Sequence, residues 1–297
     1  MKHLFRAMLL CVLLATPCLA GQWDSLVDRL AAEGLNRGYV TVLFERSMVD
    51  YDPTVMARKM DALTETHMRR LAGEKAPVPH EERAELYDQY TQPDLMQTAW
   101  EYMDSRGPIF DSIEKRFGVP REVMVALLQV ETKLGTLPGK IRVFINLASM
   151  ANSTNPDMFR QAMTQEVPAS ESEWLATYTG KKADWAFKEL AALIRYARAN
   201  RHDPLNILGS KYGAIGYCQF MPTSAEAYGV DGNGDGVVDL FTERDSIASM
   251  ANYLVKHGWM GTMTPEKRYK AVYAYNHSKH YTNAILAVAA ELEKLRR

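Results

Sequence analysis

The segment from Phe117 to Gly135, FGVPREVMVALLQVETKLG, constrains the fold of this chain more than any other. Gly118-Val119-Pro120 predicts the start of a helix, because proline is tolerated in the first helical turn and presets φ there. Gly135 predicts its end, since glycine commonly follows the last turn. The apolar residues between these signals recur at helical spacing, as Val123, Leu127, Val130 and Leu134. The segment therefore predicts a helix whose apolar stripe must be buried against other elements.

Glu131 interrupts this apolar pattern, because at about 100° per residue it projects onto the shoulder of the stripe, between Leu127 and Met124. Partial burial disfavours the charged form of a carboxyl group and raises its pKa. A carboxylic acid that keeps its proton near neutral pH can act as a general acid. The alternative is a boundary glutamate that reaches water or pairs with Arg121 or Lys133. The helix alone favours this alternative, because most helical glutamates are surface residues.

The bulk properties of the chain limit the classes of function. With 297 residues it has room for about two domains and an ample core. Its composition is ordinary for a globular protein, with 47% hydrophobic and 24% charged residues and a formal net charge of −1. This balance points to neither nucleic acid nor an anionic membrane as a partner, so any charged partner must be recognised by a local site.

Residues 1–20 have the pattern of a signal peptide, with an apolar stretch over residues 7–15 and small residues before Gly21. The apolar stretch is too short to span a bilayer, and no later one reaches the roughly 18 residues that a transmembrane helix needs. Pro17 directly before Cys18 is a poor context for lipidation, so we expect export and release instead of lipoprotein anchoring. Cleavage leaves Cys218 as the only cysteine, which excludes an intrachain disulfide. The positive residues of the leader are Lys2, His3 and Arg6.

Helical patterns recur along the rest of the chain, and we predict an all-α (mainly α) fold. Residues 21–105 form a helical N-terminal region of mixed charge in which we see no chemistry. Arg106-Gly107-Pro108 marks a turn that opens a second region, 106–297, with a helical excursion around 141–202.

A loop rich in glycine and aromatic residues follows this excursion, from Asp203 to Ser224, DPLNILGSKYGAIGYCQFMPTS. Glycines at this density are typical of places where backbone closely approaches another group. One interpretation is a tight connection packed by its own aromatic rings. The other is a binding loop, in which tyrosines and Gln219 offer stacking faces and hydrogen bonds to sugar rings.

The sharpest local motif is DGNGDGVVD, from Asp231 to Asp239. Its acidic and amide residues alternate as ligands do in a calcium loop, with glycine at the turn position and Val237 where a backbone carbonyl is used. The twelfth place holds Thr242 instead of the usual glutamate, although Asp245 could close a longer loop. The alternative is a glycine-rich turn with solvated aspartates. Hard oxygen ligands favour calcium over zinc. The candidate ligands are Asp231, Asn233, Asp235, Val237, Asp239 and Asp245.

Three separated strings occur in an order that resembles the lytic murein transglycosylase B family, whose core is lysozyme-like. They are FGVPREVMVALLQVETKLG, then DPLNILGS with YGAIGYCQFMPTSAEAYGVDGNGDG, and finally YLVKHGW with AYNHS-x-x-Y. The resemblance covers roughly Ile109 to the C-terminus, and it reverses the preference for a surface role of Glu131. Two departures are a longer stretch over residues 161–182, whose path is open, and Cys218, where a small residue is usual.

The resemblance implies roles for particular residues. Glu131 is expected to be the sole catalytic acid and base, and calcium is expected to be structural, with Asp245 completing its shell. The residues expected to line the glycan cleft are Ser210, Tyr217, Gln219, Phe220 and Met221. Those expected near the catalytic subsite are Tyr275, Asn276 and Tyr281.

The implied reaction is non-hydrolytic cleavage of peptidoglycan strands between N-acetylmuramic acid and N-acetylglucosamine, in the periplasm, giving 1,6-anhydro products. Two alternatives stay open. The first is a hydrolase on the same fold, with water replacing the C6 hydroxyl. The second is a non-catalytic scaffold that binds peptidoglycan or calcium.

Overall fold

The predicted central helix is α7 (Arg121–Thr132) in the computed structural model, which describes residues 21–74 and 89–296. Residues Glu122 to Gln129 are all buried, so α7 is enclosed on every side instead of along one stripe. Gly118, with a φ of 68°, ends the preceding helix instead of starting α7. The predicted signal peptide, residues 1–20, lies outside the described residues.

The C-terminal end of α7 differs from the prediction. The helix stops at Thr132, because Lys133 and Leu134 both have left-handed backbone conformations, with φ of 49° and 59°, before Gly135 at 84°. The prediction that Leu134 continues the helical stripe is therefore wrong. Glu131 consequently lies in the last turn of the helix, where a side chain can be reached from neighbouring segments.

The fold is all-α, as predicted, with 12 α-helices among the described residues. Local signals explain several helix starts. The Asn36 side chain accepts a hydrogen bond from the Tyr39 N–H, and that of Asp52 accepts one from the Thr54 N–H, at the starts of α2 and α3. The remaining helices are α1 (Asp24–Ala32), α2 (Arg37–Phe44), α3 (Pro53–Leu71), α5 (Pro93–Ser105), α6 (Gly107–Phe117), α8 (Val143–Asn152), α9 (Ser172–Ala199), α10 (Pro222–Tyr228), α11 (Glu243–Lys256), α12 (Pro265–Tyr275) and α13 (Lys279–Arg296).

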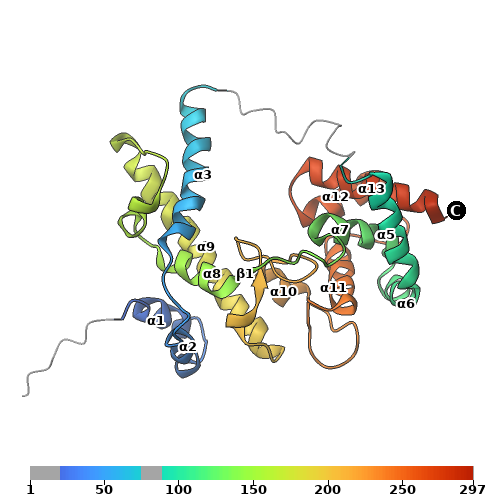
Figure 1. Ribbon diagram of the computed structural model, residues 1–297, viewed down its shortest axis with the longest axis horizontal. Coiled ribbons are helices and arrows are strands. Elements are labelled where there is room, and N and C mark those ends of the chain that lie inside the picture. Colours follow the sequence, from blue (N-terminus) through green and yellow to red (C-terminus); the bar gives the residue numbers. More distant parts are fainter. Residues whose placement is uncertain (1–20, 75–88, 297) are drawn as a thin grey trace, which may run out of the picture.

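The helices gather in two groups (Figure 1). One group contains α1, α2, α3, α8 and α9, and the other contains α5, α6, α7, α11, α12 and α13. Helix α7 packs against α13 and α5 in the second group, whereas α8 packs against α9 and α3 in the first. The division of the chain into 21–105 and 106–297 stays a prediction.

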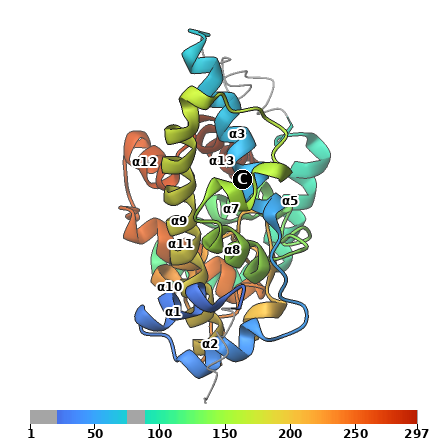
Figure 2. The ribbon, with the colours of Figure 1, turned by 90° about the vertical axis from the view of Figure 1, so that its left-hand side faces the viewer.

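The stretch 161–182, whose path the sequence left open, folds onto the first group. Short 3₁₀ turns at Pro156–Met158, Arg160–Ala162 and Ala169–Glu171 lead into α9, which begins earlier than its apolar pattern indicates. The Asp61 carboxylate of α3 accepts hydrogen bonds from the backbone N–H groups of Thr164 and Gln165. Figure 2 shows α9 running along this face of the molecule.

A two-stranded antiparallel ribbon joins the two groups. It pairs β1 (Ile141–Arg142) with β2 (Leu208–Gly209), in the register Ile141 to Gly209. A side chain at Gly139 would collide with the backbone of Gly209, since its Cβ would lie 2.1 Å from the carbonyl oxygen. This close approach fixes the start of the glycine-rich loop beside the segment that follows α7. In the described part of the chain, no helix combines the length and apolar character that a bilayer crossing requires.

Candidate active site

Glu131 and Tyr281 form the centre of the candidate site. The phenol of Tyr281, in the first turn of α13, donates a 2.5 Å hydrogen bond to Oε1 of Glu131. Burial raises the pKa of Glu131 to about 7, and the Tyr281 hydrogen bond lowers it in part. No other charged group of the described chain contributes to this shift. The site thus holds one carboxyl group that is protonated in a large fraction of molecules at neutral pH.

Tyr275 connects this centre to the glycine-rich loop. Its phenol donates a 2.6 Å hydrogen bond to the backbone carbonyl of Cys218, and its ring is stacked on that of Tyr281, with centroids 6.3 Å apart. Burial raises the pKa of both phenols well above their usual value, so both stay neutral donors at physiological pH. The Cys218 thiol is itself buried, and burial raises its pKa to about 12, which makes it an inert packing residue.

The predicted cleft residues of the loop take different positions. The Gln219 side chain donates hydrogen bonds to the carbonyls of Pro138 and Gly216, and its backbone has a left-handed φ of 48°. The Ser210 hydroxyl accepts a hydrogen bond from the Ala214 N–H. Both side chains therefore shape the loop in this structure, and their contact with a sugar stays a prediction.

Aromatic and apolar residues of the same loop divide into buried and accessible ones. Phe220 is only 3% exposed and packs against Tyr253 and Tyr275, so it lies in the core behind the site instead of lining a cleft. Tyr217 is partly exposed and its ring covers Gly135, where an added Cβ would lie 3.1 Å from it. Met221 is partly exposed at the end of the loop.

Tyr90 belongs to the surroundings of Glu131, whereas the place of Asn276 near the catalytic subsite stays a prediction. Asn276 follows the last residue of α12 and has an exposed side chain next to Tyr275. Burial raises the pKa of Tyr90, and the charge of Glu131 raises it further, which places Tyr90 within electrostatic range of the carboxyl group. Sequence reasoning missed Tyr90, because it precedes α5 without a motif of its own.

The predicted calcium loop has the backbone of an oxygen-ligand loop. Gly234 and Gly236 have φ of 81° and 85°, and the Asp231 carboxylate accepts hydrogen bonds from the N–H groups of both. Asp235 likewise accepts from the Val237 N–H. The side chains at the first, third and fifth places therefore converge on one turn, which suits a hard cation.

Asp245 reaches the calcium loop from the first turn of α11. Its two carboxylate oxygens accept hydrogen bonds from the N–H groups of Gly232 and Asp239, at 3.0 and 2.7 Å. Burial raises the pKa of Asp245, and the charges of Asp231 and Asp235 raise it further. Residues 21–74 and 89–296 contain no group of three or more His, Cys, Asp or Glu side chains arranged to hold a metal ion. The roles of Asp231, Asn233, Asp235, Val237, Asp239 and Asp245 as calcium ligands stay predictions.

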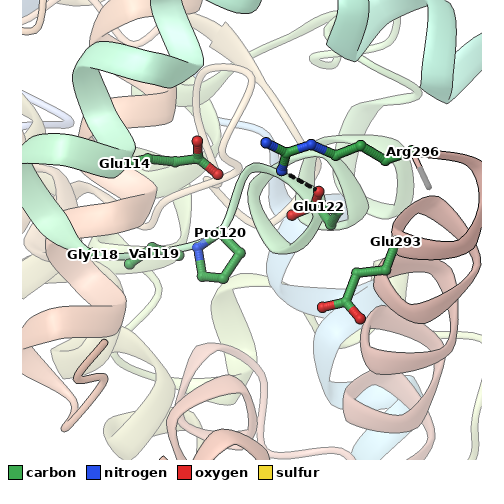
Figure 3. Close-up of a pocket in the computed structure, with 7 residues that line it drawn as sticks. All are labelled: Glu114, Gly118, Val119, Pro120, Glu122, Glu293 and Arg296. Atoms are coloured by element: carbon green, nitrogen blue, oxygen red, sulfur yellow. Dashed lines mark hydrogen bonds and ion pairs between the residues drawn. The ribbon is translucent and has the colours of Figure 1, made fainter. Parts of the chain in front are cut away.

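A cavity of about 560 Å³ lies at the other end of α7, away from Glu131 (Figure 3). The buried Glu122 carboxylate there accepts a 2.8 Å hydrogen bond from Arg296 near the C-terminus. The ion pair ties the start of α7 to the end of α13. The cavity is lined by Glu114, Gly118, Val119, Pro120, Glu122, Glu293 and Arg296.

Comparison with known proteins agrees with this geometry. The membrane-bound lytic murein transglycosylase B of Escherichia coli is 35% identical over 144 residues, which cover 48% of this chain. The alignment spans only 33% of that relative's own length.

Solved structures show the fold. The E. coli lytic transglycosylase SLT35 in complex with bulgecin A matches with a TM-score of 0.70 and 21% identity, covering 94% of both chains. The same enzyme has also been solved in complex with calcium, with a TM-score of 0.69, 21% identity and 94% coverage of both chains. SltB3 of Pseudomonas aeruginosa in complex with NAG-anhNAM-pentapeptide matches with a TM-score of 0.67 and 19% identity, over 92% of this chain and 79% of that one. The predicted lysozyme-like fold is thereby confirmed.

A family match described as the transglycosylase SLT domain covers residues 20–268, which is most of the 297-residue chain. The chain belongs to the transglycosylase SLT-domain family.

Proposed function

We propose that this protein is a lytic transglycosylase that cleaves peptidoglycan strands between N-acetylmuramic acid and N-acetylglucosamine, with Glu131 as its only catalytic acid and base. The observation that carries the proposal is the single carboxyl group with a pKa of about 7, held by Tyr281. Family membership and the likeness to lytic transglycosylases support the same reaction.

One carboxyl group suffices for this reaction. Oε1 of Glu131 accepts the Tyr281 hydrogen bond, so the proton resides on Oε2 and can pass to the glycosidic oxygen. The leaving N-acetylglucosamine then departs with a hydroxyl group, while the acetamido oxygen of the muramic residue stabilises the positive charge at C1, as in substrate-assisted glycosidases.

The second half of the reaction returns the proton. Glu131, now ionised, accepts the proton of the muramic C6 hydroxyl, whose oxygen attacks C1 and closes the 1,6-anhydro ring. No water is consumed and Glu131 regains its starting state. The neutral Tyr281 phenol keeps its hydrogen bond to Glu131, and the Tyr275 phenol holds the Cys218 carbonyl of the glycine-rich loop.

Mass spectrometry of purified peptidoglycan digested with the chain from Gly21 onward tests this proposal. We expect muropeptides one water lighter than hydrolysis products, and none with a Glu131→Gln variant that keeps its fold. Products with water added would instead identify a hydrolase. Intact glycan that sediments with the protein would identify a scaffold.

We further propose that the loop from Asp231 to Asp239 holds a structural calcium ion and that the protein acts after export to the periplasm. The solved SLT35–calcium complex and the hard-oxygen donor set support the first point. The leader-like pattern of residues 1–20 and the cell-wall substrate support the second. When bound, the ion would fix the loop that leads from α10 to α11, and it takes no part in the proton transfers.

A further inference from the structure

Two lysines share one tyrosine ring beside the glycine-rich loop. Nζ of Lys59 lies 4.5 Å from the centroid of the Tyr212 ring, and Nζ of Lys211 lies 5.2 Å from the same centroid. Both distances are within the range of a cation–π contact, so the ring partly compensates two positive charges at once.

The group is assembled from parts of the chain that are distant in sequence. Lys59 lies in α3, while Lys211 and Tyr212 follow Ser210 in the loop after β2. The loop is fixed there, because the Asn146 side chain of α8 donates a 2.9 Å hydrogen bond to the Lys211 carbonyl. The tertiary fold therefore places both ammonium groups around one ring, and neighbouring positions on one helix do not.

No carboxylate of the described chain neutralises these charges. None of its ion pairs involves Lys59, Lys211 or the nearby Lys182 of α9. Asp61, close to Lys59 in α3, is occupied by hydrogen bonds to Thr164 and Gln165.

The charged form of Lys59 is consequently disfavoured in the protein without a ligand. Burial lowers its pKa first, and the charges of Lys182 and Lys211 lower it further. Like charges held together without a counter-charge cost free energy, and an anion placed among them recovers it. The arrangement therefore suits an anionic ligand.

We propose that Lys59 and Lys211 bind a carboxylate of the peptide stem carried by the glycan strand. Lys59 comes from α3 and Lys211 from the loop after β2, and both contact the Tyr212 ring. This inference rests on the proposed function and adds a specificity for peptide-bearing strands. Within such a strand the lactyl carboxyl of muramic acid is consumed in an amide bond to the peptide, so the remaining carboxylates belong to the stem. Lys211 directly follows Ser210 in the loop predicted to bind the glycan, so a peptide stem is the anionic part of the substrate that we assign to this site.

Calorimetric titration tests the site, with Glu131→Gln as the parent protein so that the ligands are not cleaved. The two ligands are NAG-NAM-pentapeptide and the same disaccharide without the peptide, with its lactyl carboxyl group capped as a simple amide so that it carries no carboxylate. We expect the parent to bind the peptide-bearing ligand about tenfold more tightly, as charge-assisted hydrogen bonds predict, with the preference falling as salt is raised. Adding Lys59→Gln and Lys211→Gln together should abolish the preference without changing the affinity for the peptide-free disaccharide.

Two control proteins make the result specific. Lys188→Gln removes a charge from an exposed lysine of α9 and should leave the preference intact. Replacing both site lysines by arginine should also retain it, since the charge is kept. If the parent bound the two ligands with equal affinity, the proposed lysine site would be refuted while the proposed function would stand. The same would hold if the glutamine variant lost affinity equally for both ligands. If neither ligand binds the parent, the proposed function fails and this inference fails with it.

Discussion

The Tyr281 phenol donates a 2.5 Å hydrogen bond to Oε1 of Glu131. The two residues are 150 positions apart and come from the last turn of α7 and the first turn of α13. The packing of these two helices therefore sets both the orientation and the acidity of the carboxyl group. The raised pKa of this carboxyl group also predicts how the stability of the protein depends on pH.

The free energy of unfolding should fall as pH rises from about 4.5 to 7, to an extent set by Glu131. The folded-state pKa of about 7 lies above the usual pKa of 4.5 for a glutamic acid, so between these values the folded protein holds a proton that the unfolded chain has released. Stability is then lost with rising pH, by up to about 3 kcal/mol. Denaturant unfolding at pH 5 and pH 8 measures it, and Glu131→Gln should lose this part of the pH dependence. An identical pH dependence in the two proteins would contradict the raised pKa.

Tyr281→Phe should shift the alkaline limb of the pH–activity profile to higher pH. The Tyr281 hydrogen bond lowers the pKa of Glu131, so its loss leaves burial unopposed and the pKa rises further. The rate at neutral pH should fall about tenfold or more, because the carboxyl group loses the hydrogen bond that orients it. The matched variant Tyr275→Phe removes a hydrogen bond to the Cys218 carbonyl instead, and it should lower activity without moving the limb. A limb that moves equally in both variants would show that Tyr281 has no specific effect on Glu131.

Sequence reasoning predicted the helices, and the partial burial of Glu131, because both depend on local patterns. The spacing of apolar residues marked α7, where Val123 and Leu127 are buried. The position of an acidic residue on the shoulder of an apolar stripe can also be recognised from the sequence spacing. The family resemblance supplied what the pattern left open, namely which of two interpretations of Glu131 to prefer.

The features that the sequence did not predict depend on tertiary packing. Phe220 was expected in the cleft but is a core residue, because Tyr253 and Tyr275 from α11 and α12 cover it. Tyr90, just before α5, lies within electrostatic range of Glu131 although the two residues are distant in sequence. The enclosure of α7 on every side likewise depends on α5 and α13, which are distant in sequence.

Arg296→Ala should destabilise the protein although Arg296 is the last residue of α13. Its partner Glu122 is only 3% exposed, and without the guanidinium a buried carboxylate loses its ion pair. Because Arg296 itself is half exposed, we expect a loss of about 1–2 kcal/mol in the free energy of unfolding.

Lys294→Ala, which breaks an exposed pair with Glu291, serves as the control and should cost less than about 0.5 kcal/mol. Adding Glu122→Gln to Arg296→Ala should restore part of the loss, and a double variant as unstable as the sum of both single ones would refute the coupling.

Removing calcium should lower the melting temperature of the protein. A ligand that binds only the folded state stabilises it by mass action, so the melting temperature should rise with calcium concentration and fall on addition of a chelator. Asp239→Asn weakens a proposed ligand while keeping an oxygen for the Phe241 N–H group, so it should reduce the response to calcium more than the stability of the calcium-free protein. Asp245→Asn should behave differently, because an amide nitrogen would face one of the N–H groups that its carboxylate now accepts, and the loop should lose stability with or without calcium. A melting temperature that is the same with calcium and with chelator would show that the loop is a turn with solvated aspartates and not a calcium site.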